Sequence, residues 1–175
     1  TRFGDATVSS SGDITAHSTD LTSAGIYAKA GYNASINNSG VISATSDYAN
    51  AYGAYAYGLV GVAAIFNTGD VSVSANYDST GLFAKSLYDV AYINNTGDVS
   101  VSSEYGTAAY GIYASAFGST AVVLNYGGDV SASSYDSDAS AIVSVALNDV
   151  TIYNSGDLSA YSYNGDAIGI VGATT

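Results

Sequence analysis

Aspartate directly follows glycine at five points that share one position of a repeat of about 28 residues, and these carboxylates are the clearest candidates for chemistry: Asp13, Asp70, Asp98, Asp129 and Asp157. Carboxylate oxygens are ligands that Ca²⁺ prefers, so a stacked column of Asp70, Asp98, Asp129 and Asp157 is a candidate metal site. The alternative is that aspartate after glycine serves a turn and keeps the protein soluble. We favour the turn, because the glycine- and aspartate-rich nonapeptide of calcium-binding β-rolls is missing. Apart from Ca²⁺, the sequence suggests no cofactor.

Aromatic residues form a second candidate surface, because two sets recur about once per repeat. The first set is Tyr27, Tyr55, Phe83 and Tyr113, and the second is Tyr77, Tyr105 and Tyr135, continued by Tyr48 and Tyr163. We expect each set to form a ladder. In the functional interpretation, exposed rings contact glycans or neighbouring filaments. In the structural interpretation, the rings stack on one another and contribute about 0.5–1.5 kcal/mol per pair. The two interpretations are compatible.

Other kinds of chemistry have few residues to support them. The chain has no cysteine, and His17 is its single histidine, so a thiol nucleophile or a Ser–His–Asp site is not expected. Glycosidases need two carboxylates at a set separation, and no repeat stands out for catalysis, so we expect no enzyme. Fifteen acidic residues against three basic ones give a net charge of −12, which argues against a nucleic-acid partner. No apolar run is long enough for a transmembrane helix.

A repeat of about 28 residues organises these side chains. A glycine recurs at spacings of 28, 29, 28, 31 and 28 residues, and we call these six the marker glycines: Gly12, Gly40, Gly69, Gly97, Gly128 and Gly156. A fixed period of this length over a whole chain is typical of a solenoid. We therefore expect one solenoid domain over residues 1–175, long enough for a substantial core.

Each repeat contains three short segments in which apolar and polar residues alternate, which is the period of a β-strand. In one repeat they cover 71–73, 81–84 and 91–93, and the alternation directs Leu82 and Ile93 inward. Three strands and three bends per repeat predict an all-β fold, a parallel β-solenoid (β-helix) of six coils with three short strands per coil. With coils about 4.8 Å apart, the rod is about 29 Å long.

The corners of the coil have their own residue types. The marker glycine permits the positive φ that a sharp corner needs. Four marker glycines have an asparagine two residues earlier, and these amides are expected to hydrogen-bond along the stack: Asn38, Asn67, Asn95 and Asn154. Insertions are expected only in bends, above all the three extra residues between Gly97 and Gly128.

The repeat Asn-x-Gly-(Asp/x)-(Ile/Val)-Ser-Ala, with Tyr-Gly-Ile-Tyr-Ala and Val-x-Ile-x-Asn between its copies, resembles the passenger regions of Gram-negative autotransporter and haemagglutinin-like adhesins. The resemblance extends from Ala6 to Gly172. It implies a parallel β-helix that is displayed at, or released from, the outer membrane. It therefore implies an extracellular or cell-surface location, and it brings no catalytic motif with it.

The two ends of the chain suggest self-assembly. The chain opens on a strand of the 91–93 kind, with Ala6 and Val8, and closes on a strand of the 81–84 kind, with Ile170 and Gly172. In the order of the repeat, the next strand after the one with Ile170 and Gly172 would be of the 91–93 kind. The N-terminus of another copy supplies a strand of that kind. Neither end carries a device that blunts its open strand edges, and a head-to-tail contact of this kind builds filaments. The alternative is that both ends are cuts from a longer repeat array.

The favoured hypothesis is therefore a structural subunit of an extracellular filament, made by head-to-tail stacking of solenoids, in adhesion or a biofilm matrix. Its main partner is then itself. The second hypothesis is a monomeric adhesin passenger of the autotransporter type that binds a host or glycan ligand. The third is a polysaccharide-active enzyme on the same β-helix.

Overall fold

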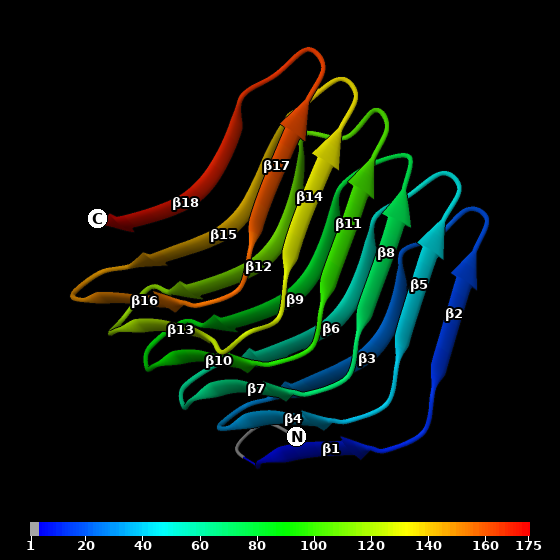
Figure 1. Ribbon diagram of the computed structural model, residues 1–175. Coiled ribbons are helices and arrows are strands. Elements are labelled where there is room, and N and C mark those ends of the chain that lie inside the picture. Colours follow the sequence, from blue (N-terminus) through cyan, green and yellow to red (C-terminus); the bar gives the residue numbers. More distant parts are fainter. Residues whose placement is uncertain (1–3) are drawn as a thin grey trace.

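The computed structural model describes residues 4–175, which form eighteen strands in three parallel six-stranded sheets (Figure 1). Sheet A contains β1 (Ala6–Ser10), β4 (Ala34–Asn38), β7 (Ala63–Asn67), β10 (Ala91–Asn95), β13 (Ala121–Asn125) and β16 (Val150–Asn154). Sheet B contains β2 (Ile14–Ser18), β5 (Ile42–Ser46), β8 (Val71–Ala75), β11 (Val99–Ser103), β14 (Val130–Ser134) and β17 (Leu158–Ser162). Sheet C contains β3 (Ser23–Ala30), β6 (Ala51–Gly58), β9 (Ser79–Ser86), β12 (Ala108–Ala116), β15 (Asp138–Ala146) and β18 (Ala167–Thr174).

Three consecutive strands make one coil, so coil 1 is β1–β3 and coil 6 is β16–β18. The coils stack in parallel register, and Ile93 of β10, for example, lies between Ile65 of β7 and Val123 of β13. The predicted solenoid of six three-stranded coils is therefore confirmed. The described residues contain no helix that could cross a membrane.

The core fills the inside of the coils, as the alternation predicts. Ile36, Ile65 and Ile93 on sheet A are fully buried, and Leu82 and Ile112 on sheet C are equally inaccessible. Small alanines share the inward positions with these large residues. The layers can therefore interdigitate without voids, and burial of a large aliphatic side chain contributes about 1.5–3 kcal/mol.

The strands of sheet C are longer than expected, because each continues through a bend. In β6 both Gly53 and Ala54 are buried, so the alternation skips one residue there. A Cβ atom at Gly53 would collide with the side chain of Val71, and a second contact would fall on the carbonyl oxygen of Gly81. Glycine therefore lets the strand bend inward against the next coil.

The marker glycines are needed for close approach, and the expectation of positive φ at these positions is wrong. Among the described glycines only Gly127 has positive φ, at 91°. A Cβ atom at Gly69 would collide with the carbonyl oxygen of Gly40, and the same collision occurs at every later marker glycine. Coils pack so tightly at this corner that only a hydrogen atom fits between them.

The three extra residues of the fourth repeat lie in bends, as expected. Compared with the third repeat, two of them lie in the bend between β11 and β12, and the third lies beside Gly127, between β13 and β14. The strands on either side keep their register with the neighbouring coils. Bends tolerate insertions because their backbone is not tied into the sheets.

We expect Gly97→Ala to destabilise the fold by about 1–3 kcal/mol, as overpacking of a tight site does. Its new Cβ would strike the carbonyl oxygen of Gly69. Gly12→Ala is the matched control, because nothing lies within 4 Å of a Cβ at Gly12. Urea unfolding at low protein concentration measures both variants, and equal stability of the two would contradict the close-approach explanation.

Candidate functional site

An asparagine ladder runs along the inner side of the corner between sheets A and B. Asn38 donates from Nδ2 to Oδ1 of Asn67 at 2.9 Å, and Asn67 donates in the same way to Asn95 at 2.8 Å. The ladder continues through Asn125 to Asn154 at 2.8 and 2.7 Å. The amides of the four predicted positions thus hydrogen-bond along the stack. Asn125 is an additional member that precedes its marker glycine by three residues.

Every amide of this ladder also holds its own corner. Asn95 Nδ2 donates its second hydrogen to the carbonyl of Gly97 at 2.6 Å, and Asn67 does the same to Gly69. Asn95 is fully buried, and a buried amide is costly unless it is hydrogen-bonded. The ladder satisfies this need and has a direction, because every Nδ2 points toward the next coil. At its start, Oδ1 of Asn38 is buried without a partner.

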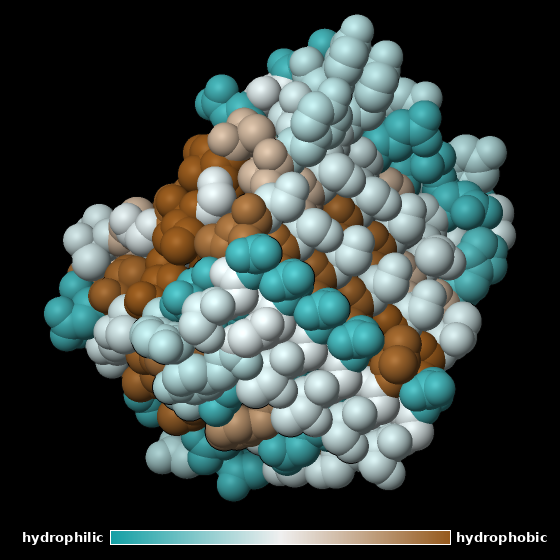
Figure 2. Space-filling view, viewed as in Figure 1, coloured by the Kyte–Doolittle hydropathy of each residue, from teal (hydrophilic) through white to brown (hydrophobic). Residues whose placement is uncertain are grey.

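The aspartates lie on the outer side of the same corner, where Figure 2 shows a line of hydrophilic side chains along the stack. Oδ1 of Asp70 accepts the backbone N–H of Asp98 at 3.0 Å, and Oδ1 of Asp98 accepts that of Asp129 at 2.9 Å. Asp129 accepts the N–H of Asp157 at 2.9 Å. Each carboxylate therefore ties its coil to the next, which supports the turn interpretation.

The Ca²⁺ site at Asp70, Asp98, Asp129 and Asp157 stays a prediction. Each of the first three uses one oxygen for a backbone hydrogen bond and keeps the other toward solvent. Within residues 4–175, no three carboxylates or imidazoles come together as a metal-binding group.

The first aromatic set lies on the outer face of sheet C. The ring centroids of Tyr55 and Phe83 are 4.7 Å apart, and those of Phe83 and Tyr113 are 4.9 Å apart, with planes within 12° and 3° of parallel. Tyr27 lies 5.2 Å from Tyr55 and is tilted. In such a stack each ring face covers the next, so Phe83 shows solvent only its edge. The column thus supports the structural interpretation and leaves little ring face for a sugar.

Two tyrosines that sequence reasoning missed widen this aromatic column. Tyr52 lies 5.3 Å from Tyr55, and Tyr110 lies 5.1 Å from Tyr113. The pKa of Tyr55 is raised to about 12, mainly because the side chain is buried and to a smaller extent because of the charges that neighbouring phenols would carry. The Tyr55 phenol is therefore uncharged at neutral pH, which suits a closely packed group of rings.

The second aromatic set divides into two columns. The backbone N–H of Tyr105 bonds to the carbonyl of Asn76, whereas that of Tyr135 bonds to the carbonyl of Ser103. Tyr135 therefore stands in register with Glu104, and Tyr105 stands in register with Tyr77. Among the described residues, the one stacked pair of this set is Tyr135 and Tyr163, with centroids 4.9 Å apart and planes 2° from parallel.

The four residues expected at the assembly ends lie on the two outermost coils. Ala6 and Val8 are half-buried on β1. Ile170 is 46% exposed, although its counterpart Ile142 in coil 5 is fully buried. Gly172 is exposed beside it on β18. Figure 2 shows hydrophobic surface inside the triangle traced by β16, β17 and β18, so the cross-section of the core is open at coil 6.

His17 lies at the surface between a hydroxyl and a carboxylate. Its Nδ1 lies 2.9 Å from Oγ1 of Thr45, and its Nε2 lies 3.8 Å from a carboxylate oxygen of Asp47. All three side chains stand on the outer side of coils 1 and 2. This contact links two coils at the surface.

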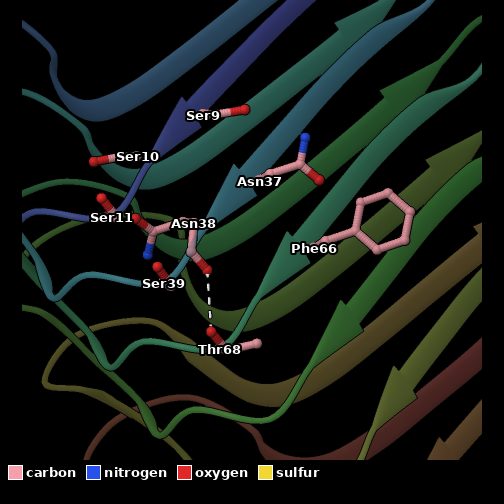
Figure 3. A pocket seen from close by; sticks show the side chains of 8 residues that line it. All are labelled: Ser9, Ser10, Ser11, Asn37, Asn38, Ser39, Phe66 and Thr68. Atoms are coloured by element: carbon pink, nitrogen blue, oxygen red, sulfur yellow. Dashed lines mark hydrogen bonds between the residues drawn. The ribbon is translucent and has the colours of Figure 1, made fainter.

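Two shallow hollows lie on the outside of the rod. The first, of about 450 Å³, is near the corner of sheets A and B in coils 1–3. Figure 3 shows hydroxyl and amide groups around it, with the ring of Phe66 at one side and Thr68 close to the backbone of Asn38. The second, of about 440 Å³, lies at the β11–β12 bend in coils 3–5 and includes Glu104, Tyr105 and Tyr135. Glu104 is the chain's single glutamate.

Comparison of the chain with protein-family models, with curated proteins and with solved structures gave no match.

We expect Asn95→Asp to destabilise the fold more at neutral than at acidic pH. The carboxylate would lose both donors and face the oxygens of Asn125 and Gly97. Loss of such a buried network costs about 3–5 kcal/mol. Burial and facing oxygens raise the pKa of this carboxyl, so protonation restores a donor as the pH falls.

Asn94→Asp is the matched control, since Asn94 is the outward neighbour of Asn95 on the same strand. Urea unfolding of both variants between pH 7 and pH 4 makes the measurement. A pH-independent loss in Asn95→Asp, or an equal loss in Asn94→Asp, would contradict the ladder's role.

The double change Asp98→Asn/Asp129→Asn tests the aspartate column. Amide oxygens still accept the backbone N–H groups, and mutual repulsion of carboxylates about 4.8 Å apart is removed. We expect the variant to equal or exceed the parent in melting temperature at low salt. Millimolar Ca²⁺ should stabilise the parent alone. Equal responses to Ca²⁺ in calorimetry would remove the cation site from consideration.

Proposed function

We propose that this protein is a structural subunit of an extracellular filament that grows by head-to-tail stacking of solenoid coils. The observation that carries the proposal is the open, hydrophobic cross-section of the outermost coils. Ile170 is 46% exposed where Ile142 is fully buried, and β1 and β16 pair on one side only within residues 4–175. Covering this surface with a second copy would bury it at about 25 cal/mol per Å².

The two end coils are complementary in strand type and in register. Sheet A ends in β16 at one end and β1 at the other, and sheets B and C likewise end in β17 and β2 and in β18 and β3. Continuing the register places Val8 of a following copy opposite Ile152 and Ser10 opposite Asn154. All three sheets then continue across the junction without a change of strand order.

The polar columns give the contact its direction. Asn154 is the last amide of the ladder, and its free Nδ2 hydrogen would meet Oγ of Ser10 in the following copy. The carboxylate of Asp157 would meet the N–H of Asp13, as Asp129 meets that of Asp157. Heterologous contacts of this kind do not close into rings, so they build filaments.

The extracellular setting rests on composition and on the resemblance to autotransporter and haemagglutinin-like passengers. A cysteine-free chain with net charge −12 and an unusually regular solenoid suits a fibre in adhesion or a biofilm matrix. The second candidate is a single adhesin rod, in which the same open coils continue into further coils of a longer array. The exposed tyrosines at the bends favour that candidate's ligand-binding role.

Gly12→Ala should abolish filaments without harming the rod. Within one copy its Cβ has open space, but in the stack it would strike the carbonyl of Gly156 in the preceding copy, as a Cβ at Gly40 would strike Gly12. Ser11→Ala is the matched control, because Ser11 is the exposed neighbour in the same bend. Negative-stain microscopy and sedimentation of the 175-residue chain compare the parent with both variants.

We expect long fibrils from the parent and from Ser11→Ala, and single short rods with unchanged melting temperature from Gly12→Ala. Single rods from the parent at high concentration would favour the longer-array candidate. Fibrils from Gly12→Ala would show that assembly does not run through these coil faces.

A further inference from the structure

We propose that the outer side of the β11–β12 bend binds a neutral oligosaccharide. The site is the hollow of about 440 Å³ across coils 3–5, which is within the usual size range for small-ligand pockets. The groups that would make it are Ser74, Asn76, Ser102, Glu104, Tyr105 and Tyr135. The inference does not rest on filament formation, because none of these groups belongs to coil 1 or coil 6.

A free aromatic face is the first feature of this site. One face of the Tyr135 ring is covered by Tyr163, 4.9 Å away and almost parallel. The opposite face is turned toward coil 4, where Glu104 occupies the register position and no ring of the described residues stacks on Tyr135. On sheet C, by contrast, both faces of Phe83 are covered. The C–H face of a pyranose ring packs on such an electron-rich ring face.

The polar groups around that face suit hydroxyls. Asn76, Glu104 and Tyr135 follow one another in register on coils 3, 4 and 5, so an amide and a carboxylate stand in line with the free ring face. A carboxylate accepts two O–H groups at once, and an amide both donates and accepts. Beside them Oγ of Ser102 donates to Oγ of Ser74 at 3.0 Å. A sugar diol offers the matching donors and acceptors.

Electrostatics selects a neutral sugar. The charge of Glu104 would repel a uronic acid or a sulfated sugar. The lysines stand elsewhere, on β3 and β9 of sheet C, where Lys29 lies over the ring of Tyr57 and Lys85 over that of Phe117. With no cation in the hollow among the described residues, an anionic ligand has nothing to pair with.

The hollow also coincides with the longest bend between a strand of sheet B and a strand of sheet C, counted in register. This bend is two residues longer than the bend of coil 3 and one residue longer than that of coil 5, and it contains the chain's single glutamate. By contrast, the asparagine ladder and the Phe83 stack repeat one kind of side chain, which pairs with its own kind. Binding residues concentrate on loops that a rigid scaffold positions, and this loop is the exceptional one.

Isothermal titration of the 175-residue chain with four neutral tetrasaccharides tests the proposal: cellotetraose, maltotetraose, laminaritetraose and mannotetraose. Tetragalacturonate is the anionic comparison. We expect at least one neutral sugar to bind, and Tyr135→Ala and Glu104→Gln each to weaken that binding about tenfold or more, as loss of a charged hydrogen bond does. Tyr48→Ala, which removes an exposed bend tyrosine of coil 2, should leave binding unchanged.

Circular dichroism of each variant checks that the rod is folded, and Glu104→Gln keeps the side-chain shape. No binding of any neutral sugar at its solubility limit overturns the proposal. Binding that neither Tyr135→Ala nor Glu104→Gln weakens overturns the site. Tetragalacturonate binding as tightly as the best neutral sugar overturns the ligand class.

Discussion

Parallel pairing of one coil on the next is the constraint on which the rest of this structure depends. Backbone hydrogen bonds hold successive coils about 4.8 Å apart, and the register never slips between neighbouring strands. Each side chain therefore meets the residue at the same position of the next coil. Residues that pair well with their own kind are selected: glycine where no Cβ fits, asparagine where an amide can both donate and accept, and aromatic rings where faces can stack.

Much of this order was predictable, because period-2 alternation identifies strands and inward positions directly. The inward positions of Ile93 and Leu82 and the hydrogen-bonded amides of Asn67 and Asn95 follow from that pattern. The misplaced residue was Tyr135, which lies seven residues after its marker glycine but was grouped with Tyr105, which lies eight residues after its own. Counted from the first residue of the preceding sheet B strand, Tyr135 is five residues on, like Glu104, while Tyr105 is six. The marker glycine and the strand after it keep a fixed spacing of two residues in every coil, so a difference of one residue places Tyr135 and Tyr105 in different columns.

The reason for a glycine was harder to infer than its position. A sequence shows that Gly69 recurs, but backbone freedom and lack of space produce the same recurrence. Only the neighbouring coil decides between them, and there the carbonyl of Gly40 occupies the space of a Cβ. Gly127, which does need positive φ, occurs once and leaves no periodic signal. A residue that recurs at the period of the repeat thus indicates a contact between coils more reliably than it indicates a special backbone conformation.

Where the side chains of a column pair with one another, their hydrogen-bonding groups and ring faces are already occupied. The faces of Phe83 lie against other rings, the amide of Asn95 is fully hydrogen-bonded, and the carboxylate of Asp98 holds a backbone N–H. Groups remain available for other molecules only where a column is interrupted. Two kinds of interruption in the described chain bear on the proposals: the faces of coils 1 and 6, and the bend where Glu104 stands in line with Tyr135. The first kind exposes strand edges and core, which suits another copy of the chain. The second exposes a ring face beside a carboxylate, which suits a small polar ligand. The same stacking rule that makes the rod regular therefore also locates the two proposed contact surfaces.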